Sequence, residues 1–208
     1  MNHIPHYEKW SKCMQKSPIE LWLIRHGETE WSISGQHTSR TDIPLTDHGR
    51  QRAVEIHEYL QNQNFSQVLT SPRQRAQETC RIAGFGDLAQ TDENLREWDY
   101  GVYEGRTTAD IRKDQPGWSI WDTTPPEGES LDEVAARCQK IIDRSLSAGG
   151  KVVLFSHAHL LRILAATWIG LRPRAGSTLA LGTGSVSRLG FERETRVILT
   201  WNRSFEVE

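Results

Sequence analysis

The chain has 208 residues, of which 37% are hydrophobic and 25% are charged, and its formal net charge is −2. A chain of this length encloses one hydrophobic core, so we expect a single domain. The balanced charge leaves no basic excess that would attract nucleic acid or an anionic membrane surface, so any bound anion has to be met by a local cluster of cations.

The chain begins with a polar stretch that ends at Pro18, and we expect residues 1–18 to form an extension ahead of a folded domain at residues 19–208. This stretch lacks the continuous apolar run of a signal peptide, and no later segment is long enough to cross a bilayer. The three cysteines are odd in number and lack the spacing of metal ligands, which favours free thiols. We therefore expect a cytoplasmic protein.

A strand and a helix are expected at the start of the domain. Residues 19–24, IELWLI, form a short apolar run rich in strand-forming side chains. Residues 45–63 follow a helical pattern with their apolar positions on one face, and Thr46 is the expected N-cap.

The same order is repeated further along the chain. A second strand is expected at residues 66–71, and a helix at residues 71–86 with Pro72 in its first turn and Gly84 near its end. The unit of strand followed by helix is therefore present twice in the first half of the sequence.

The second half continues the alternation. A Ser-x-x-Glu capping box, Ser130 and Glu133, predicts the start of a helix over residues 130–147. The remaining predicted elements are an apolar strand at 151–157, a helix at 160–170 and two closing strands at 183–192 and 196–202.

Strands that alternate with helices indicate an α/β protein, a three-layer α/β/α sandwich around a mainly parallel sheet. In such sheets ligands bind beyond the carboxyl ends of the strands. Arg25 and His26 follow the first strand, Arg75 follows the second, and His157 ends the strand that begins at residue 151. We therefore expect these four side chains to meet at one edge of the sheet.

Two arginines and two histidines at one edge favour phosphoryl chemistry. The guanidinium groups of Arg25 and Arg75 are suited to holding phosphoryl oxygens, because each presents a charged, planar fork of donors. A neutral His26 between them is the expected nucleophile, with its second ring nitrogen held by a backbone carbonyl and Gly27 letting the chain fold closely around the ring. His157 is expected to serve as a second cation or donor.

A leaving alkoxide needs a proton, and three carboxylic acids in residues 95–105 compete for that role: Glu97, Asp99 and Glu104. Glu97 is favoured because it lies next to Trp98 and is expected to be partly buried. Glu104 precedes Gly105 and is expected in a turn.

Four short motifs occur in a fixed order over residues 21–159: RHGETEW, SPRQRAQET, EWDYGVYEG and SHAH. In this order they resemble the histidine phosphatase superfamily, also called the phosphoglycerate mutase-like family. The resemblance makes residues 19–208 the catalytic domain, His26 the phosphorylated nucleophile and Glu97 the proton donor. It also implies that Arg25, Arg75 and His157 form the phosphate pocket.

Within the superfamily the sequence is most similar to the small acid phosphatase and sedoheptulose-bisphosphatase branch. That similarity implies a substrate side formed by Ser32, Gln36, His37, Thr38, Ser39, Ser71, Tyr100 and Arg162. The chain departs from the family pattern where Ser32 replaces a frequent Asn, and where Ser39 and Ala158 replace Gly. These changes bear on substrate fit more than on the chemistry.

The leading hypothesis is a metal-independent phosphatase that needs no cofactor and acts on small phosphorylated metabolites, including sugar phosphates or bisphosphates. A phosphoglycerate mutase is the first alternative, although Thr108 stands where such mutases carry a lysine and residues 114–130 contain no cation. A module that binds phosphate without hydrolysing it is the second alternative.

Other features keep further interpretations open. A zinc site that includes His157 and His159 is disfavoured because the neighbouring arginines repel a dication. The eight tryptophans leave a homodimer contact open, and Trp118 and Trp121 are expected either to plug a surface groove or to wall the substrate entrance. If His26 must be neutral and Glu97 protonated, activity should fall at both extremes of pH, with an optimum on the acid side of neutrality.

Overall fold

The central strand β1, Glu20–Arg25, is buried and pairs in parallel with β4, Lys151–Ser156, and antiparallel with β5, Val186–Glu192. The computed structural model of the chain describes residues 19–205. The extension predicted at residues 1–18 lies outside the described residues.

One sheet runs through the molecule in the strand order β3-β2-β4-β1-β5-β6. β2, Gln67–Thr70, pairs in parallel with β4 and with the short β3, Ala89–Thr91. The closing strand β6, Thr195–Arg203, pairs antiparallel with β5. The sheet is mixed and mostly parallel, so the predicted α/β fold class is confirmed.

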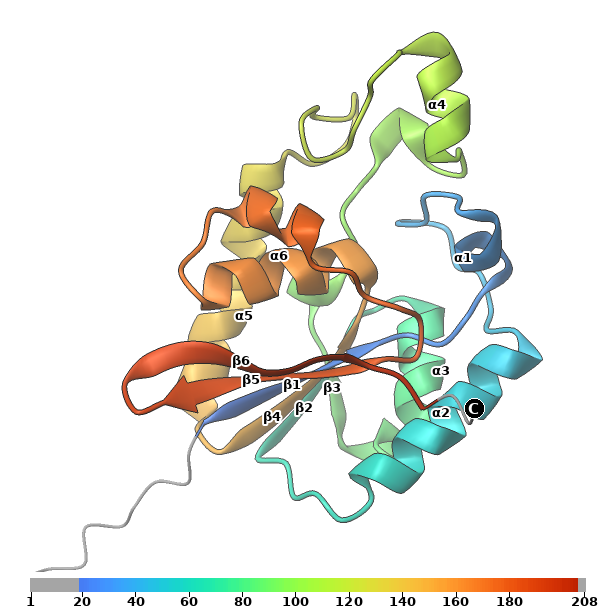
Figure 1. The fold of residues 1–208 in the computed structure, drawn as a ribbon. Helices are drawn as coiled ribbons and strands as arrows, with labels where there is room; N and C mark the ends of the chain where they lie inside the picture. Colours follow the sequence, from blue (N-terminus) through green and yellow to red (C-terminus); the bar gives the residue numbers. More distant parts are fainter. Residues whose placement is uncertain (1–18, 206–208) are drawn as a thin grey trace, which may run out of the picture.

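Helices cover both faces of the sheet, as Figure 1 shows. On one face α2, Asp47–Leu60, and α3, Gln74–Ile82, pack against the side chains of Trp22 and Ile24 from β1. On the other face α5, Leu131–Ala148, and α6, Ala158–Trp168, pack against the alternate residues Leu21 and Leu23. Because successive side chains of a strand point to opposite faces, β1 contributes to both halves of the core.

The predicted capping residues of two helices are confirmed, and the predicted place of Pro72 in a third helix is wrong. The Thr46 hydroxyl accepts the N–H of Gly49 ahead of α2, and Ser130 and Glu133 form the capping box of α5. Pro72 does not lie in the first turn of α3. Arg73 keeps extended backbone angles (φ −77°, ψ 135°) as the N-cap, so the helix begins only at Gln74.

Short elements that the sequence pattern does not predict complete the fold. Two helices, α1, Glu30–Ser34, and α4, Thr108–Asp114, stand on the α6 side of the molecule in Figure 1. An antiparallel bridge between Gln36 and Thr107 joins these two segments. Four 3-10 turns occupy the connections: η1, Gly86–Leu88; η2, Glu93–Leu95; η3, Gly101–Tyr103; and η4, Pro173–Thr178.

Within residues 19–205, no helix combines the length and the apolar character needed to cross a membrane.

Candidate active site

A cavity of about 180 Å³ opens where β1 ends. Its lining residues are Arg25, His26, Thr29, Trp31, Ser32, Gly35, Gln36, His37, Thr38, Glu97, Tyr100, Ala158 and His159. The cavity therefore lies beyond the carboxyl end of a parallel strand, where ligands bind in open α/β sheets.

His26 is buried at the base of this cavity. Its Nδ1 lies 2.7 Å from the carbonyl oxygen of Gly27, and since a carbonyl only accepts, Nδ1 carries the proton. Burial, followed by the charges of Arg75 and Arg25, lowers the pKa of His26 well below its usual value. The ring is therefore neutral near pH 7, and Nε2 keeps its lone pair.

The loop after β1 is held by a close approach between two glycines. A Cβ on Gly27 would lie 2.4 Å from the carbonyl oxygen of Gly49, and a Cβ on Gly49 would lie 2.3 Å from that of Glu28. Gly27 is thus required where the loop meets the first turn of α2, and not by the His26 ring as predicted. The Thr79 hydroxyl of α3 accepts the Gly27 N–H at 3.0 Å and holds the same loop from a second side.

Arg25 lines the cavity with spare donor capacity. Its Nη1 donates to the carbonyl oxygen of Leu181 at 2.5 Å, while its Nε is sealed from solvent and has no hydrogen-bond partner. Burial lowers the pKa of Arg25 to about 10, so the guanidinium is still charged at neutral pH. A buried, charged donor without a partner is costly unless a ligand satisfies it.

Arg75 is fully buried behind His26 and does not line the cavity. Its Nη1 donates to Thr41 O at 3.0 Å and its Nη2 to Thr38 O at 3.1 Å, so the guanidinium holds the loop over residues 38–41. Its Nε donates to Nδ1 of His157 at 3.2 Å. In this structure the fork expected to hold phosphate is engaged with backbone carbonyls.

His157 lies beside His26, with 5.2 Å between the two ring centroids. Because Arg75 Nε only donates, Nδ1 of His157 is an acceptor, and the Nε2 proton is directed to the Ser71 hydroxyl at 2.7 Å. Burial and the charge of Arg75 lower the pKa of His157 well below its usual value. The ring is therefore neutral and donates its one N–H to Ser71, and His157 does not line the cavity, so its expected role toward phosphate stays a prediction.

Nδ1 of His157 thus uses its lone pair to accept from Arg75 and Nε2 carries the proton, so no lone pair of the ring is left for a metal ion. Within the described part of the chain, no group of three or more His, Cys, Asp or Glu side chains is placed to hold a metal.

Glu97 brings its carboxylate to the amino end of α6. Its Oε1 accepts the N–H groups of Trp98 at 2.9 Å and Leu160 at 3.0 Å, and its Oε2 accepts that of His159 at 3.1 Å. The side chain therefore caps a helix from more than sixty residues away in sequence. Oε2 accepts only one of these bonds and keeps a lone pair for a proton.

The two competing acids are used elsewhere. Asp99 forms an ion pair with Arg40 at 2.6 Å. Glu104 accepts the N–H groups of Ser39 and Thr41 and the hydroxyl of Ser39, as part of the turn that precedes Gly105. Of the three candidates only Glu97 lines the cavity.

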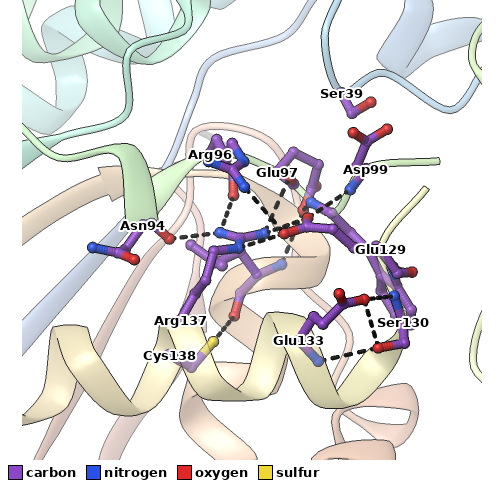
Figure 2. Close-up of polar contacts among 12 residues, drawn as sticks. Ser39, Asn94, Arg96, Glu97, Asp99, Glu129, Ser130, Glu133, Arg137 and Cys138 are labelled. Carbon is purple, nitrogen blue, oxygen red and sulfur yellow. Dashed lines mark hydrogen bonds and ion pairs between the residues drawn. The ribbon is translucent and has the colours of Figure 1, made fainter. Parts of the chain in front are cut away.

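A buried ion pair holds the segment that carries Glu97 (Figure 2). Arg137 of α5 binds the Glu129 carboxylate through two bonds of 2.8 Å, and it also donates to the carbonyl oxygens of Asn94 and Arg96. Glu129 in turn accepts the Asp99 N–H at 3.1 Å. This network fixes the backbone on both sides of Glu97.

The predicted substrate-side residues fall into two groups. Those that line the cavity are Ser32, Gln36, His37, Thr38 and Tyr100. Those that do not are Ser39, which is bound to Glu104; Ser71, which is bound to His157; and Arg162, which donates to the carbonyls of Gly176 and Ser177 and lies over the Trp121 ring.

Ala158, whose replacement of Gly was expected to bear on substrate fit, lines the cavity, and so do four residues that the sequence did not assign to the substrate side: Thr29, Trp31, Gly35 and His159. Thr29 and Trp31 lie inside the first motif, so their position was the available signal. His159 is the last residue of the fourth motif, SHAH, so its position was likewise the available signal.

The sequence over residues 21–204 matches the family model of the histidine phosphatase superfamily (branch 1). An acid phosphatase of Mycobacterium tuberculosis is 37% identical over 180 residues, which covers 85% of this chain and 88% of that protein. Sedoheptulose 1,7-bisphosphatase of Saccharomyces cerevisiae is 35% identical over 182 residues, covering 72% and 67%. A probable phosphoglycerate mutase of Yersinia enterocolitica is 32% identical over 193 residues, covering 88% and 90%.

Solved structures give the same relationship. A functionally characterised Mycobacterium tuberculosis protein superposes with a TM-score of 0.84 at 36% identity, covering 89% of this chain and 98% of that one. A putative alpha-ribazole-5'-P phosphatase of Escherichia coli superposes with a TM-score of 0.80 at 28% identity, covering 92% and 100%.

Proposed function

The chain belongs to branch 1 of the histidine phosphatase superfamily, and from that premise we propose that it is a metal-independent phosphatase of small phosphorylated metabolites. The reaction runs through a phosphohistidine on His26. The substrates belong to the class of sugar phosphates and bisphosphates.

One observation carries this proposal. The His26 ring is neutral, its Nδ1 proton is held by Gly27 O at 2.7 Å, and its Nε2 shares a cavity with Arg25 and Glu97. A nucleophile, a cation for the phosphoryl oxygens and an acid for the leaving group therefore face the same small volume.

In the first step the Nε2 lone pair of His26 attacks phosphorus and the bond between phosphorus and the ester oxygen breaks. The Arg25 guanidinium, which lines the cavity, binds the phosphoryl oxygens, and the departing alkoxide takes a proton from Oε2 of Glu97. Charge that develops on phosphoryl oxygens is stabilised by such fixed donors in a desolvated site.

In the second step a water molecule attacks the phosphohistidine. Glu97, now ionised, accepts a proton from that water, the bond between phosphorus and Nε2 breaks, and inorganic phosphate leaves. The proton donor and the His26 lone pair are both regenerated, so one water is consumed for each ester bond broken.

Water is favoured over a bound phosphoglycerate as the acceptor of the phosphoryl group. At the position where mutases carry a lysine, Thr108 places its hydroxyl 3.2 Å from Nε2 of His37, so a neutral pair occupies the site of a cation. Burial lowers the pKa of His37 to about 4, which keeps this pair uncharged near neutral pH. Of the arginines in the described part of the chain, only Arg25 lines the cavity.

Two of the similar proteins are named for phosphorylated sugars or their derivatives, the sedoheptulose bisphosphatase and the ribazole phosphatase. These names support the substrate class proposed for this chain. The neutral, hydrogen-bonding side chains of Gln36, His37 and Tyr100 in the cavity lining suit the hydroxyl groups of such substrates.

The test is phosphate release from a panel of phosphorylated metabolites in the presence of a chelator, with wild type and His26→Ala. We expect wild type to turn over with the chelator present and His26→Ala to lose at least a thousandfold in kcat. His48→Ala is the matched control, because His48 is an exposed histidine outside the cavity. A phosphorylated enzyme should be trapped by rapid alkaline quench in wild type and not in His26→Ala.

Turnover by His26→Ala at the wild-type rate would overturn the nucleophile assignment. Transfer of phosphoryl between two positions of phosphoglycerate in excess of phosphate release would indicate a mutase. Tight phosphate binding with neither turnover nor a trapped intermediate would indicate a module that only binds.

A further inference from the structure

The His159 ring lines the cavity, and the mechanism above does not use it. The Nδ1 atom of His159 lies 2.7 Å from the Tyr100 hydroxyl oxygen. Its backbone N–H donates to Oε2 of Glu97, so the residue stands next to the proposed proton donor. It is thus placed on the side of the cavity where the alcohol part of a substrate leaves.

The state of this pair follows from the surroundings of the two side chains. Burial, and then the charge of Glu97, raises the pKa of Tyr100 well above its usual value, so the phenol keeps its proton. Burial, and then the charge of Arg162, lowers the pKa of His159 well below its usual value, so the imidazole is neutral. One proton lies on the hydroxyl and one lies on a ring nitrogen.

The hydrogen bond decides which ring nitrogen that is. Tyr100 is 2% exposed, and its hydroxyl has no other acceptor among the residues that the structure describes. Leaving a buried hydroxyl proton without an acceptor is unfavourable, so the hydroxyl donates to Nδ1. His159 then carries its proton on Nε2.

Aromatic side chains fix the ring in this orientation. The centroid of the His159 ring lies 5.2 Å from that of Trp121, 6.1 Å from that of Trp98 and 5.7 Å from that of Tyr100. Its Nε2 has no partner among residues 19–205 and is not one of the sealed polar atoms, so this N–H is free to meet a ligand.

We propose that His159 is a specificity-determining residue of the reaction: its Nε2–H, oriented by Tyr100, donates to a hydroxyl or ether oxygen of the substrate's alcohol part. Tyr100 acts as a positioning residue. This inference rests on the proposed function and names the feature that a good substrate carries, an oxygen acceptor near the ester bond.

The chemistry of a neutral donor explains the expected selectivity. A substrate with a hydroxyl near the ester satisfies the N–H, whereas an alkyl phosphate of the same length leaves it unpaired in a desolvated cavity. Sites built to bond a hydroxyl discriminate against analogues that lack it for this reason. A neutral imidazole does not attract a second phosphate as a cation would, so selection is for hydroxyl groups and not for charge.

The test compares phosphate release from glycerol 3-phosphate and from propyl phosphate, which have three-carbon chains with and without hydroxyl groups. Wild type should favour glycerol 3-phosphate. His159→Phe keeps a ring between Trp98 and Trp121, and it should lower kcat/KM for glycerol 3-phosphate about tenfold more than for propyl phosphate. His159→Gln retains an N–H donor and should recover part of the difference.

Tyr100→Phe tests the positioning role. It should reduce the ratio of kcat/KM for glycerol 3-phosphate to kcat/KM for propyl phosphate by less than His159→Phe does. The double variant should show no further loss in this ratio, because both changes act on the same interaction with the substrate. His48→Phe is the control outside the cavity. Equal losses for both esters in His159→Phe would mean that the ring only supports the fold, and would overturn the proposal.

A second readout does not depend on turnover. In ¹⁵N-histidine-labelled His26→Ala protein, the His159 resonance, identified by its loss in His159→Phe, should report a proton on Nε2. It should shift when glycerol 3-phosphate is added and much less when propyl phosphate is added. A proton on Nδ1 of His159 would overturn the inference, whether or not wild type hydrolyses either ester. If the spectrum is as expected but wild type releases no phosphate, only the proposed function is contradicted.

Discussion

The two ends of the cavity are built in different ways. The phosphate end, which is the end proposed to hold phosphate, is formed where a buried strand stops, with Arg25 as the last residue of β1 and His26 directly after it, and His157, which follows β4, lies beside His26 outside the cavity lining. The alcohol end is formed by long connections, with His37 and Tyr100 reaching it from segments that contain little regular structure.

The supports of the two ends differ in the same way. At the phosphate end the histidines are bonded to neighbouring backbone and to side chains from the same sheet edge, such as Gly27 and Ser71. At the alcohol end two carboxylates hold the backbone from outside, Glu104 for residues 39–41 and Glu129, with Arg137, for the segment of Glu97. In the proposed mechanism the nucleophile is thus held at the sheet edge, while the proton donor and the residues proposed to contact the alcohol part are held by loops, which tolerate change.

The largest effect is expected where the alcohol end depends on its buried ion pair. Arg137→Met should lower the free energy of unfolding by about 3 kcal/mol, the low end for breaking a buried pair, because Arg96 still contacts Glu129 at 3.3 Å. Urea unfolding measures this loss. Arg144→Met is the control on the same helix, since the Arg144 ion pair is partly exposed.

Arg137→Met should also affect the hydrolysis of two kinds of phosphate ester differently. If Arg137 positions Glu97, hydrolysis of an alkyl phosphate should fall more than hydrolysis of p-nitrophenyl phosphate, whose leaving group needs no proton. Equal losses for the two esters would indicate a general effect on the fold.

At the phosphate end we expect a large loss of activity with little loss of stability. Arg25→Met should reduce kcat by about 10²- to 10³-fold, as for loss of one donor to a developing oxyanion. It should change the free energy of unfolding by less than about 1 kcal/mol, because it removes a buried charge whose Nε is unpaired along with one bond to Leu181. Phosphate release measures the loss in kcat, and urea unfolding measures the change in stability. A large fall in the free energy of unfolding would contradict the prediction.

For a single residue, the smallest effect is the loss of stability in acid. His26, His37, His157 and His159 all have a pKa below the ordinary histidine value of 6.5, so the unfolded chain takes up protons near pH 6.5 while the folded chain does not. The free energy of unfolding should therefore fall as the pH is lowered from 7 to 5. For His37, whose pKa is lowered to about 4, the loss should run from pH 6.5 down to 4.

His37→Gln and His37→Phe differ in packing, yet both remove this titration. Both should reduce the slope of stability against pH by the same amount, measured as urea midpoints between pH 7 and 5. A slope as steep as that of wild type in either variant would contradict the depressed pKa of His37.

Several features were predictable because they are local. The alternation of apolar runs and helical patterns gave the strands and the long helices, and Thr46 and Ser130 lie where the helix caps were expected. The short α1 and α4 and the three-residue β3 were missed because such segments have too few positions for a periodic pattern. The error at Pro72 has the same origin, since the backbone angles of Arg73 decide where α3 begins.

By itself the sequence determined which strand ends carry arginine and histidine, and from these positions it predicts phosphoryl chemistry at one edge of the sheet. Only the tertiary structure decided which atoms are free there: that Arg75 holds the 38–41 loop, that Glu97 caps α6, and that His159 is bonded to Tyr100. The physical reason is that each of these bonds joins residues more than thirty positions apart. Sequence spacing specifies helix and strand periods, whereas such pairs meet only once the whole sheet is packed.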